Sequence, residues 1–476
     1  MATSHLPRRS ADLTSILSLF VAWKAVLLLV VAASPGPGYD TSSELMLFDQ
    51  LDTSKDARGF VSRILLRLVR WDSVYFVNIA HRGYLYEQEW AFGRGFMFLT
   101  GQLAKVLPAS FLPSPLLQQA LAGSVIAHLA HALTCVFLYE LTFRALPANA
   151  RDRRQIARVA ACLHVLSPAG IFLSAPYTES LFACLNLFGM LCLALTSEKS
   201  ENFLGRVSHS LCFAAAGVSF ALASTVRSNG VLSALALAVL CLPAVRGFLS
   251  QPFNGRDTST LMSGAVGVAV TAVGTIAPQY VAYRYYCTGE VSHPRPWCSA
   301  MPPSIYSFVQ KHYWGNGFLA YWTFSNSPLF LIAAPTLMLL FSTAYMILFG
   351  QWPLAITKPA GEKGSGESQG QTGGNGMILR ALAAPQLLLS VLCLTSFHVQ
   401  IVNRISSGYP VWYIALAMFI VDKGERQVGD LTTTGLVFSV TSRTLCSTGN
   451  QKGLVRVMML YGIIQAGLYA SFLPPA

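Results

Sequence analysis

The chain has 476 residues, of which 53% are hydrophobic and 11% charged, and its mean hydropathy is +0.49. This composition excludes an ordinary soluble multidomain protein and indicates a polytopic membrane protein. The formal net charge of +12 does not indicate a nucleic-acid partner, because the basic residues form short clusters between apolar segments, as in cytoplasmic loops that face anionic membrane lipids.

The first predicted span runs from about Leu13 to Ala33. Two arginines precede it and no convincing small-residue cleavage site follows it, so we interpret it as a retained signal anchor with a cytosolic N-terminus. The polar segment 36–115 then forms a long first loop on the opposite, lumenal side. Within this loop, Phe60 to Val69 has the spacing of an interfacial helix, and the apolar stretch Phe96 to Leu107 is too short to cross a membrane alone.

Ten further apolar segments, the last at Gly453 to Phe472, predict an all-α fold with about eleven transmembrane helices. If the chain crosses the membrane at each of these segments, most basic clusters fall on the cytosolic side. The Gly/Ser-rich segment 351–378 falls on the same side, and we interpret it as a flexible loop without chemistry. The lumenal side receives segments 36–115 and 287–327. Cys287 and Cys298 lie at one lumenal loop and are either disulfide-bonded, if the lumen is oxidising, or two free thiols.

The segment from Arg70 to Phe96 contains acids and aromatic rings in a chain that is otherwise mostly apolar. We hypothesise that Asp72 is a catalytic base. Trp71 offers a ring face for stacking a sugar, and Glu87 and Glu89 carry carboxylates that can hydrogen-bond sugar hydroxyls. The alternative is that Asp72 is an ordinary interfacial side chain and that the aromatic residues belong to a membrane-interface belt.

Several cationic residues are expected to face this segment. Arg227 lies between two apolar spans, where a guanidinium costs about 2.5–3.5 kcal/mol on insertion scales unless it is paired or hydrated, so it either snorkels to the interface or binds an anion such as a lipid phosphate. His398 and Arg404 follow another span. Together they predict a rim that suits a phosphate-linked lipid leaving group. Glu179, at the turn between two spans, either caps the next helix or contacts substrate.

Motifs for other chemistries are missing from the sequence. There is no P-loop, no glycine-rich dinucleotide turn, no Gly-x-Ser-x-Gly elbow and no zinc spacing. His128 and His131 lie three residues apart in one apolar span, and we interpret them as packing residues rather than metal ligands.

Five ordered motifs resemble those of the GPI-anchor α-1,6-mannosyltransferase family, GT-C type enzymes of the endoplasmic reticulum that add the second mannose of the GPI core. The resemblance runs through most of the chain. Tyr75, where the animal-type pattern has histidine, and Gly93-Arg94, where Phe-Pro is expected, favour a fungal member, and no role is carried over to position 75. The motifs are WDSVYFVNIAHRGYLYEQEWAF at 71–92, SPAGIFLSAPYTESLF at 167–182, RSNG at 227–230, YWGNGFLAYW at 313–322 and HVQIVNR at 398–404.

This resemblance implies transfer of mannose from dolichyl phosphate mannose, in the lumen, to the first mannose of a GPI lipid, with inversion and formation of an α-1,6 bond. It implies Asp72 as the base, no cofactor and no metal requirement, and a small membrane partner subunit for the fungal enzyme. The expected partners are therefore the two lipid substrates, membrane lipids and this subunit. The predicted substrate-binding residues are Trp71, Glu87, Glu89, Glu179, Arg227, Asn229, Trp314, His398 and Arg404.

Two other functions are compatible with parts of the sequence. One is another dolichyl-phosphate-mannose-dependent GT-C enzyme that acts on an N-glycan or a protein. The other is a membrane lipid transporter or flippase, which the many spans and Arg227 would suit. The lack of paired halves and of acidic residues inside the spans weighs against transport.

Overall fold

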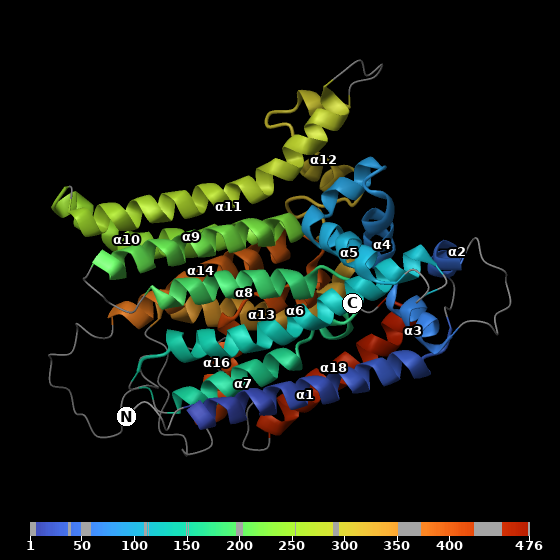
Figure 1. Ribbon diagram of the computed structural model, residues 1–476, viewed down its shortest axis with the longest axis horizontal. Coiled ribbons are helices and arrows are strands. Elements are labelled where there is room, and N and C mark those ends of the chain that lie inside the picture. Colours follow the sequence, from blue (N-terminus) through green and yellow to red (C-terminus); the bar gives the residue numbers. More distant parts are fainter. Residues whose placement is uncertain are drawn as a thin grey trace.

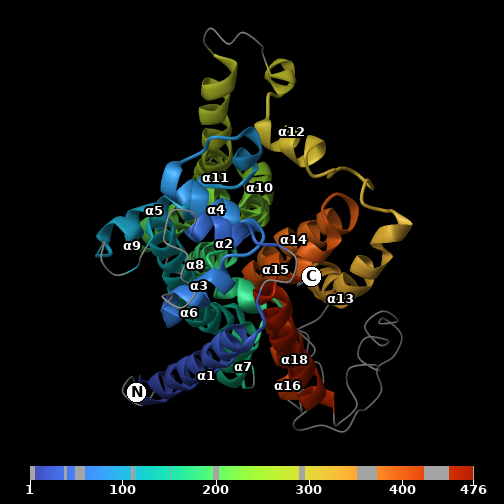
Figure 2. The same cartoon turned by 90° about the vertical axis from the view of Figure 1, so that its right-hand side faces the viewer.

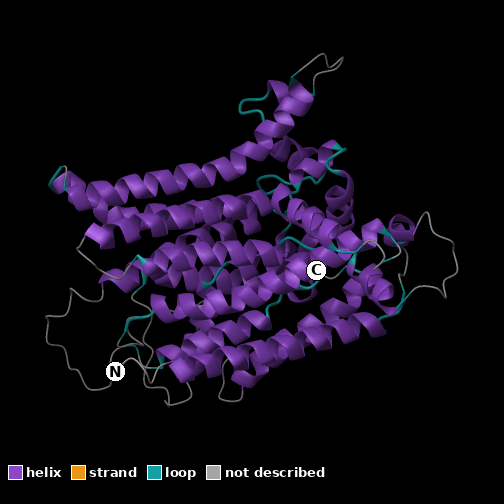
Figure 3. Ribbon diagram, viewed as in Figure 1, coloured by secondary structure: helices purple, strands orange, loops and turns teal. Residues whose placement is uncertain are grey.

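The computed structural model describes residues 6–36, 40–48, 59–108, 112, 114–148, 150, 152–196, 203–252, 254–288, 295–350, 373–422 and 450–474. Within these ranges the regular elements are all helical (Figure 3). The long helices lie side by side along the longest axis of the molecule (Figure 1). The predicted all-α fold of a polytopic membrane protein is therefore confirmed. Most of the predicted flexible segment 351–378, up to residue 372, lies outside the described residues.

The bundle consists of long helices, and shorter helices and 3₁₀ turns connect them. The long helices are α1 (Leu6–Ala33), α6 (Pro115–Ala145), α7 (Arg153–Val165), α8 (Glu179–Leu195), α9 (Phe203–Val226), α10 (Ala234–Ser250), α11 (Gly255–Cys287), α13 (Ser327–Phe349), α14 (Gly373–Thr395), α16 (Val411–Asp422) and α18 (Asn450–Ala470). The shorter elements are α2 (Ser42–Phe48), α3 (Phe60–Leu68), α4 (Asp72–Arg82), η2 (Glu87–Ala91), α5 (Arg94–Val106), η3 (Gly170–Leu173), η4 (Ser228–Ser233), η5 (Pro296–Ser299), α12 (Ile305–His312), η6 (Phe324–Asn326), η7 (Val399–Ile401), α15 (Val402–Ile405) and η8 (Ser406–Gly408).

Each predicted span corresponds to one of the long helices, but the expected number of membrane crossings is not confirmed. Among the described residues, eight helices are long and apolar enough to cross a membrane, or nine if the pair Val399–Gly408 and Val411–Val421, bent by 77°, forms one span. The difference has a physical reason. Helix α7 has 13 residues, hence a length of about 20 Å, whereas a hydrocarbon core is about 30 Å thick. Helix α8 has 17 residues, just below the usual length.

The short helices gather at one end of the bundle. Figure 2 shows α2, α3, α4, α12 and α15 together on the face that is turned to the viewer. The predicted helix at Phe60 to Val69 is confirmed as α3, and the short apolar stretch Phe96 to Leu107 lies largely in α5, a helix of 13 residues. Asp72, which was expected in a polar loop, is instead the first residue of α4.

Basic residues are paired with acids near the start of α1. Asp12 accepts a hydrogen bond from the Tyr139 hydroxyl at 2.9 Å and forms an ion pair with Arg154. Glu140 pairs with Arg144 one turn further along α6. Because Asp12 and Glu140 lie at the start of α1 and near the end of α6, this ionic cluster is at the other end of the bundle from α2–α4.

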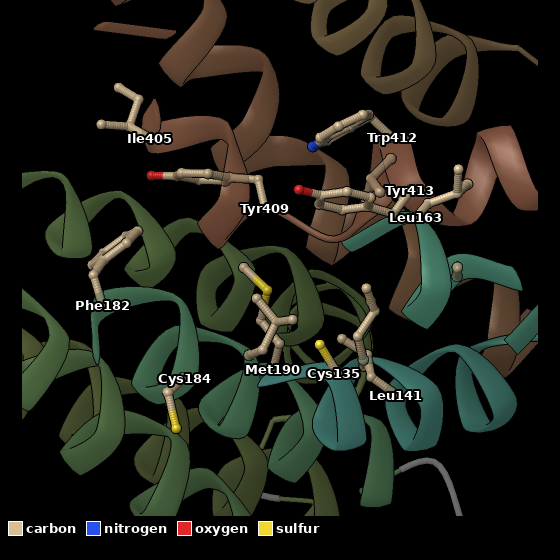
Figure 4. Packing of buried hydrophobic residues seen from close by; sticks show 14 of the residues in the cluster. Cys135, Leu141, Leu163, Phe182, Cys184, Met190, Ile405, Tyr409, Trp412 and Tyr413 are labelled. Atoms are coloured by element: carbon tan, nitrogen blue, oxygen red, sulfur yellow. The ribbon is translucent and has the colours of Figure 1, made fainter. Parts of the chain in front are cut away.

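The break between helices α15 and α16 is packed into the core of the bundle. Tyr409, Trp412 and Tyr413 lie over α6, α7 and α8 in Figure 4, and all three are at most 1% exposed. Tyr413 donates to Ser167 Oγ at 2.8 Å. Within the break, the carbonyl of Gly408 accepts a hydrogen bond from Asn186 Nδ2 at 2.9 Å. These bonds hold the break in place, and so they also position the short helix α15 that precedes it.

The segment before Asp72 is anchored to the end of α18. The Arg70 guanidinium is buried and lies over the Phe472 ring, 5.0 Å from its centroid. The Tyr469 hydroxyl donates to the Leu68 carbonyl at 2.8 Å, and the Tyr177 hydroxyl donates to the Arg70 carbonyl at 3.0 Å. Burial lowers the pKa of Arg70 to about 10, so its side chain remains charged at neutral pH.

Trp71 has an unusual backbone conformation immediately before Asp72. Its φ is 55° and its ψ is −129°, a region that bulky residues rarely adopt and that costs about 1–3 kcal/mol. Its ring packs against Phe472 with centroids 5.3 Å apart. Packing at the C-terminal end of the described chain therefore stabilises the backbone turn from which α4 starts.

We expect Phe472→Ala to lower the free energy of unfolding by about 3 kcal/mol, because a buried aromatic ring is lost beneath both Arg70 and Trp71. Thermal unfolding in detergent measures the effect as a lower midpoint. Phe472→Leu is the matched control and keeps most of the buried volume. Equal midpoints for the alanine variant and the wild type would show that this contact does not stabilise the turn.

Candidate active site

Four charged side chains from distant parts of the chain form one ion-pair network. Arg404 Nη1 and Nη2 lie 3.2 and 3.3 Å from Asp72 Oδ2. Arg404 Nε also lies 3.6 Å from Glu179 Oε1, which accepts a hydrogen bond from Arg227 Nη1 at 2.9 Å. The charges thus alternate in the order Asp72, Arg404, Glu179, Arg227, and their formal sum is zero.

The two carboxylates of this network have different surroundings. The Glu179 side chain is 0% exposed, whereas that of Asp72 is 38% exposed. Both bonds from Arg404 go to Asp72 Oδ2, and Asp72 Oδ1 makes no hydrogen bond with the described residues. Each acid is the first residue of a helix, where the helix dipole favours negative charge. Glu179 therefore holds the two arginines, while Asp72 presents a free oxygen.

A cavity of about 300 Å³ opens beside this network. Its wall combines α4, the turn after α9, the segment after α12 and the elements η7 and α15. His398 Nε2 lies 2.9 Å from the Trp314 carbonyl and must donate to it, so the neutral ring keeps its lone pair on Nδ1. Six of the ten predicted site residues line the cavity: Asp72, Arg227, Asn229, Trp314, His398 and Arg404.

The other four predicted residues do not line this cavity. Glu179 lies behind the arginines, and Trp71 packs on Phe472. Glu87 accepts hydrogen bonds from Trp297 Nε1 at 2.6 Å and from the Tyr313 hydroxyl at 3.3 Å. Glu89 pairs with Arg82 at 2.6 Å and accepts the backbone N–H of Leu85 at 2.9 Å. The suggested substrate contacts of Trp71, Glu87, Glu89 and Glu179 stay predictions.

Glu87 joins the first loop to the segment 295–326. Burial raises the pKa of Tyr313, and the negative charge of Glu87 raises it further, so the Tyr313 hydroxyl keeps its proton and donates to Glu87. Cys287 and Cys298, whose state the sequence left open, form a disulfide with their Cα atoms 5.6 Å apart. The disulfide and Glu87 together fix this segment over the cavity.

Some cavity residues had not been predicted. Tyr306 and Gln310, on α12, line the cavity, and Ser228 Oγ donates to the Tyr306 hydroxyl at 2.7 Å. Gly93 also lines it, and a Cβ at this position would collide with the backbone carbonyl oxygens of Thr225 and Val226. The departure from the family pattern at Gly93 therefore coincides with a close approach of two backbones. That departure was the signal that the sequence offered at this position.

One further cluster has metal-ligand chemistry but lies in the core of the bundle. The ligand atoms of His131, Cys135 and His164 are within 4.8 Å of one another, and all three residues are buried. His131 Nε2 lies 3.4 Å from the His164 carbonyl, and His164 Nε2 lies 2.9 Å from the Ser407 carbonyl, so both rings already have protein partners. The His131 ring also packs on Phe20, with centroids 5.2 Å apart. We therefore interpret the cluster as packing, and the packing role of His131 stays a prediction.

The sequence is similar to a known family over nearly its whole length. The model of the family described as mannosyltransferase (PIG-V) matches residues 13–476. GPI mannosyltransferase 2 of Aspergillus fumigatus is 38% identical over 477 residues, which cover 99% of this chain and 94% of the relative. The protein of the same name from Aspergillus oryzae is 37% identical over 480 residues, with 100% and 99% covered.

Solved structures show a weaker similarity. The apo crystal structure of the Archaeoglobus fulgidus oligosaccharyltransferase aligns with 96% of this chain at 14% identity and a TM-score of 0.44. This chain covers 56% of that protein.

We expect Arg404→Gln to lower the free energy of unfolding by about 3 kcal/mol, because Glu179 would lose one of its two partners in a buried site. Asp72 would also lose its partner, so transfer activity should fall. The double variant Arg404→Gln/Glu179→Gln should recover part of the thermal stability in detergent but none of the activity. An additive loss of stability in the double variant would contradict this coupling.

The close approach at Gly93 gives a second prediction. Gly93→Ala should displace the end of α9 and with it Arg227, because backbone atoms cannot rotate away as a side chain can. A displacement of about 1 Å can cost roughly 10²-fold in rate. Transfer measured in membranes should therefore fall at an unchanged protein level. Gly59→Ala is the matched control, since its Cβ would meet no atom within 4 Å. Equal activities of the two variants would contradict the prediction.

Proposed function

We propose a donor, an acceptor and a mechanism for this chain, which belongs to the mannosyltransferase (PIG-V) family and is an integral membrane mannosyltransferase of GPI-anchor biosynthesis. Mannose is transferred from dolichyl phosphate mannose to the first mannose of a GPI lipid. The bond formed is α-1,6, and the configuration of the donor is inverted. The reaction takes place on the lumenal side of the endoplasmic reticulum membrane. The family membership sets aside the transporter alternative.

The observation that carries this proposal is the meeting of Asp72 with Arg404 and Arg227 at one cavity. An inverting displacement needs a base for the acceptor hydroxyl and positive charge for the departing phosphate. The cavity offers both. Arg404 pairs with Asp72 at 3.2 Å, and Arg227 lines the same cavity, so the base and the positive charges face one space.

Asp72 is suited to be the base. Its free Oδ1 accepts the proton of the acceptor hydroxyl while that oxygen forms a bond to the anomeric carbon. The bond from the anomeric carbon to the phosphate oxygen breaks at the same time, and its electron pair leaves with dolichyl phosphate. Arg404 holds the carboxylate by Oδ2, which fixes the direction of Oδ1. Positioned general-base catalysis typically contributes about 10²- to 10⁴-fold.

The arginines are suited to the leaving phosphate. Guanidinium groups bind phosphate through parallel N–H donors, and a lipid monophosphate has fewer charges to neutralise than a diphosphate. Among the described residues that line the cavity, Asp72 is the only carboxylate, and it is already paired. Divalent cations such as Mg²⁺ bind through carboxylates and substrate phosphates. We therefore propose a metal-independent reaction without a cofactor.

Two features support the lumenal side. Disulfides persist in oxidising compartments, and the Cys287–Cys298 bond lies beside Trp297, which donates to Glu87 of the first loop. The ionic cluster with its arginines lies at the other end of the bundle, where the positive-inside rule expects the cytosol.

A lipid-linked donor is also supported by an apolar groove of about 790 Å³. Phe330, Leu331 and Met338 of α13 form much of it, and Leu394 of α14 faces them. Trp322 lies at the groove and donates to the Leu394 carbonyl at 2.7 Å. The ring of the neighbouring Tyr321 stacks on that of His398 with centroids 4.6 Å apart, so the groove lies close to the cavity.

We also propose a small membrane partner subunit, on the resemblance to the fungal family alone.

We expect Asp72→Asn to reduce transfer from dolichyl phosphate mannose by about 10²- to 10⁴-fold, because the amide cannot take the proton. The assay uses membranes that contain equal amounts of protein. Asp257→Asn is the matched control, since Asp257 lies in the first turn of α11, at the far end from the cavity. Near-normal activity of Asp72→Asn would remove this residue from the mechanism.

A further inference from the structure

Lys24 is a basic residue inside a membrane span, and the proposed mechanism does not use it. It lies in the apolar stretch Arg9–Ala33 of α1 and is only 4% exposed. Within the described residues it forms no ion pair with a carboxylate. Its amino group instead donates to the Leu173 carbonyl at 2.8 Å and to Ser174 Oγ at 2.7 Å. Because an ionisable side chain is costly to insert into a membrane, a residue of this kind is expected to have a function.

Lys24 does not belong to the catalytic cavity. It is not among the residues that line this cavity. Helix α1 lies on the opposite side of the bundle from α12, whose Tyr306 and Gln310 do line it (Figure 1). An effect of Lys24 on the reaction must therefore pass through the residues that it contacts.

The two acceptors of Lys24 lie at the end of the 3₁₀ turn η3. Leu173 is the last residue of this turn and Ser174 follows it, and both are buried. The Leu173 carbonyl also accepts a hydrogen bond from Ser180 Oγ at 3.2 Å, in the first turn of α8. The last carbonyl groups of a helical turn have no partner within it, so other groups must satisfy them. Lys24 and Ser180 do this here, and Lys24 thus joins α1 to the end of η3.

The residue before Leu173 supports Arg404. The guanidinium carbon of Arg404 lies 4.7 Å from the centroid of the Phe172 ring, which is buried. A cation is attracted to the negative face of an aromatic ring. The guanidinium nitrogens of Arg404 face Asp72 and Glu179, while the Phe172 ring supports the group from another side. The orientation of this guanidinium therefore depends on where η3 holds Phe172.

We propose that Lys24 is a positioning residue for mannose transfer. It holds the end of η3 and so keeps the Phe172 ring at Arg404, in the orientation in which this guanidinium meets Asp72. The inference rests on the proposed function, in which Arg404 directs Asp72 and stabilises the departing phosphate. Without the amino group of Lys24, two buried acceptors would lose a donor, and η3 would shift to satisfy them elsewhere.

The test measures kcat and KM of purified variants in detergent, with kcat expressed per folded protein. Lys24→Met keeps an unbranched side chain but has no donor. Its kcat should fall roughly 10- to 10²-fold, because a displacement of about 1 Å can cost 10²-fold in rate. KM for dolichyl phosphate mannose should equal that of the wild type, since the lost interaction acts in the transition state. Ile16→Ala, also buried on α1, is the matched control and should lower the thermal midpoint without a change in kcat.

A double variant distinguishes positioning from a general loss of stability. Arg404→Gln should lower kcat by itself, and Lys24→Met added to it should cause no further fall, because Lys24 acts through Arg404. A further fall in the double variant, or a wild-type kcat in Lys24→Met, would overturn the positioning role. A wild-type kcat in Arg404→Gln would instead overturn the proposed function of Arg404, and the inference with it.

A second substitution keeps the test decisive if Lys24→Met does not fold. Ser174→Ala removes one of the two acceptors of Lys24 and little volume. It should lower kcat in the wild-type background but cause no further loss in Arg404→Gln protein. An unchanged kcat of Ser174→Ala in the wild-type background would then decide against the role of Lys24.

Discussion

The buried carboxylate of Glu179 is the constraint on which the site depends. Two guanidinium groups as close together as those of Arg227 and Arg404 repel each other, and in a poorly hydrated environment this repulsion is strong. Glu179 lies between them and accepts from Arg227 directly. The Glu179 carboxylate is fully buried. If water took its place, the favourable ion pairs with both arginines would be lost, at a large cost in free energy. The cationic side of the cavity thus exists because an acid is hidden behind it.

Most of the remaining structure holds the members of this network in place. Asp72 starts a helix whose first turn is anchored by Arg70 and Trp71 to the end of α18. Arg404 is carried by a short helix at a break that is bonded to the core through Tyr413 and Gly408. The two residues are 332 positions apart in sequence. Their contact therefore requires that the whole bundle be assembled, and activity is a property of the complete fold.

Much of this could be predicted from the sequence, and the limits have physical reasons. Long apolar runs indicate helices, and a charged residue such as Arg227 or Arg404 is conspicuous between them. The sequence does not show which residue is the partner of another. Glu87 resembles a substrate ligand in the sequence, but in the structure Trp297, 210 positions away, donates a hydrogen bond to it. Tyr306 and Gln310 are neutral residues of the short helix α12 and give no signal. The expected eleven crossings are not confirmed, and apolar character alone does not reveal that the helix of one predicted span, α7, has only 13 residues.

The break between α15 and α16 makes the segment around it sensitive to length as well as to composition. Arg404 is joined through this segment to a break that is anchored at Gly408 and Tyr413. Inserting or deleting one residue between Arg404 and Trp412 would change the length of this connection and displace the guanidinium from both acids, even if every side chain were kept. Evolution of this stretch is accordingly expected to proceed by substitution, while gaps and extra residues accumulate elsewhere in the chain.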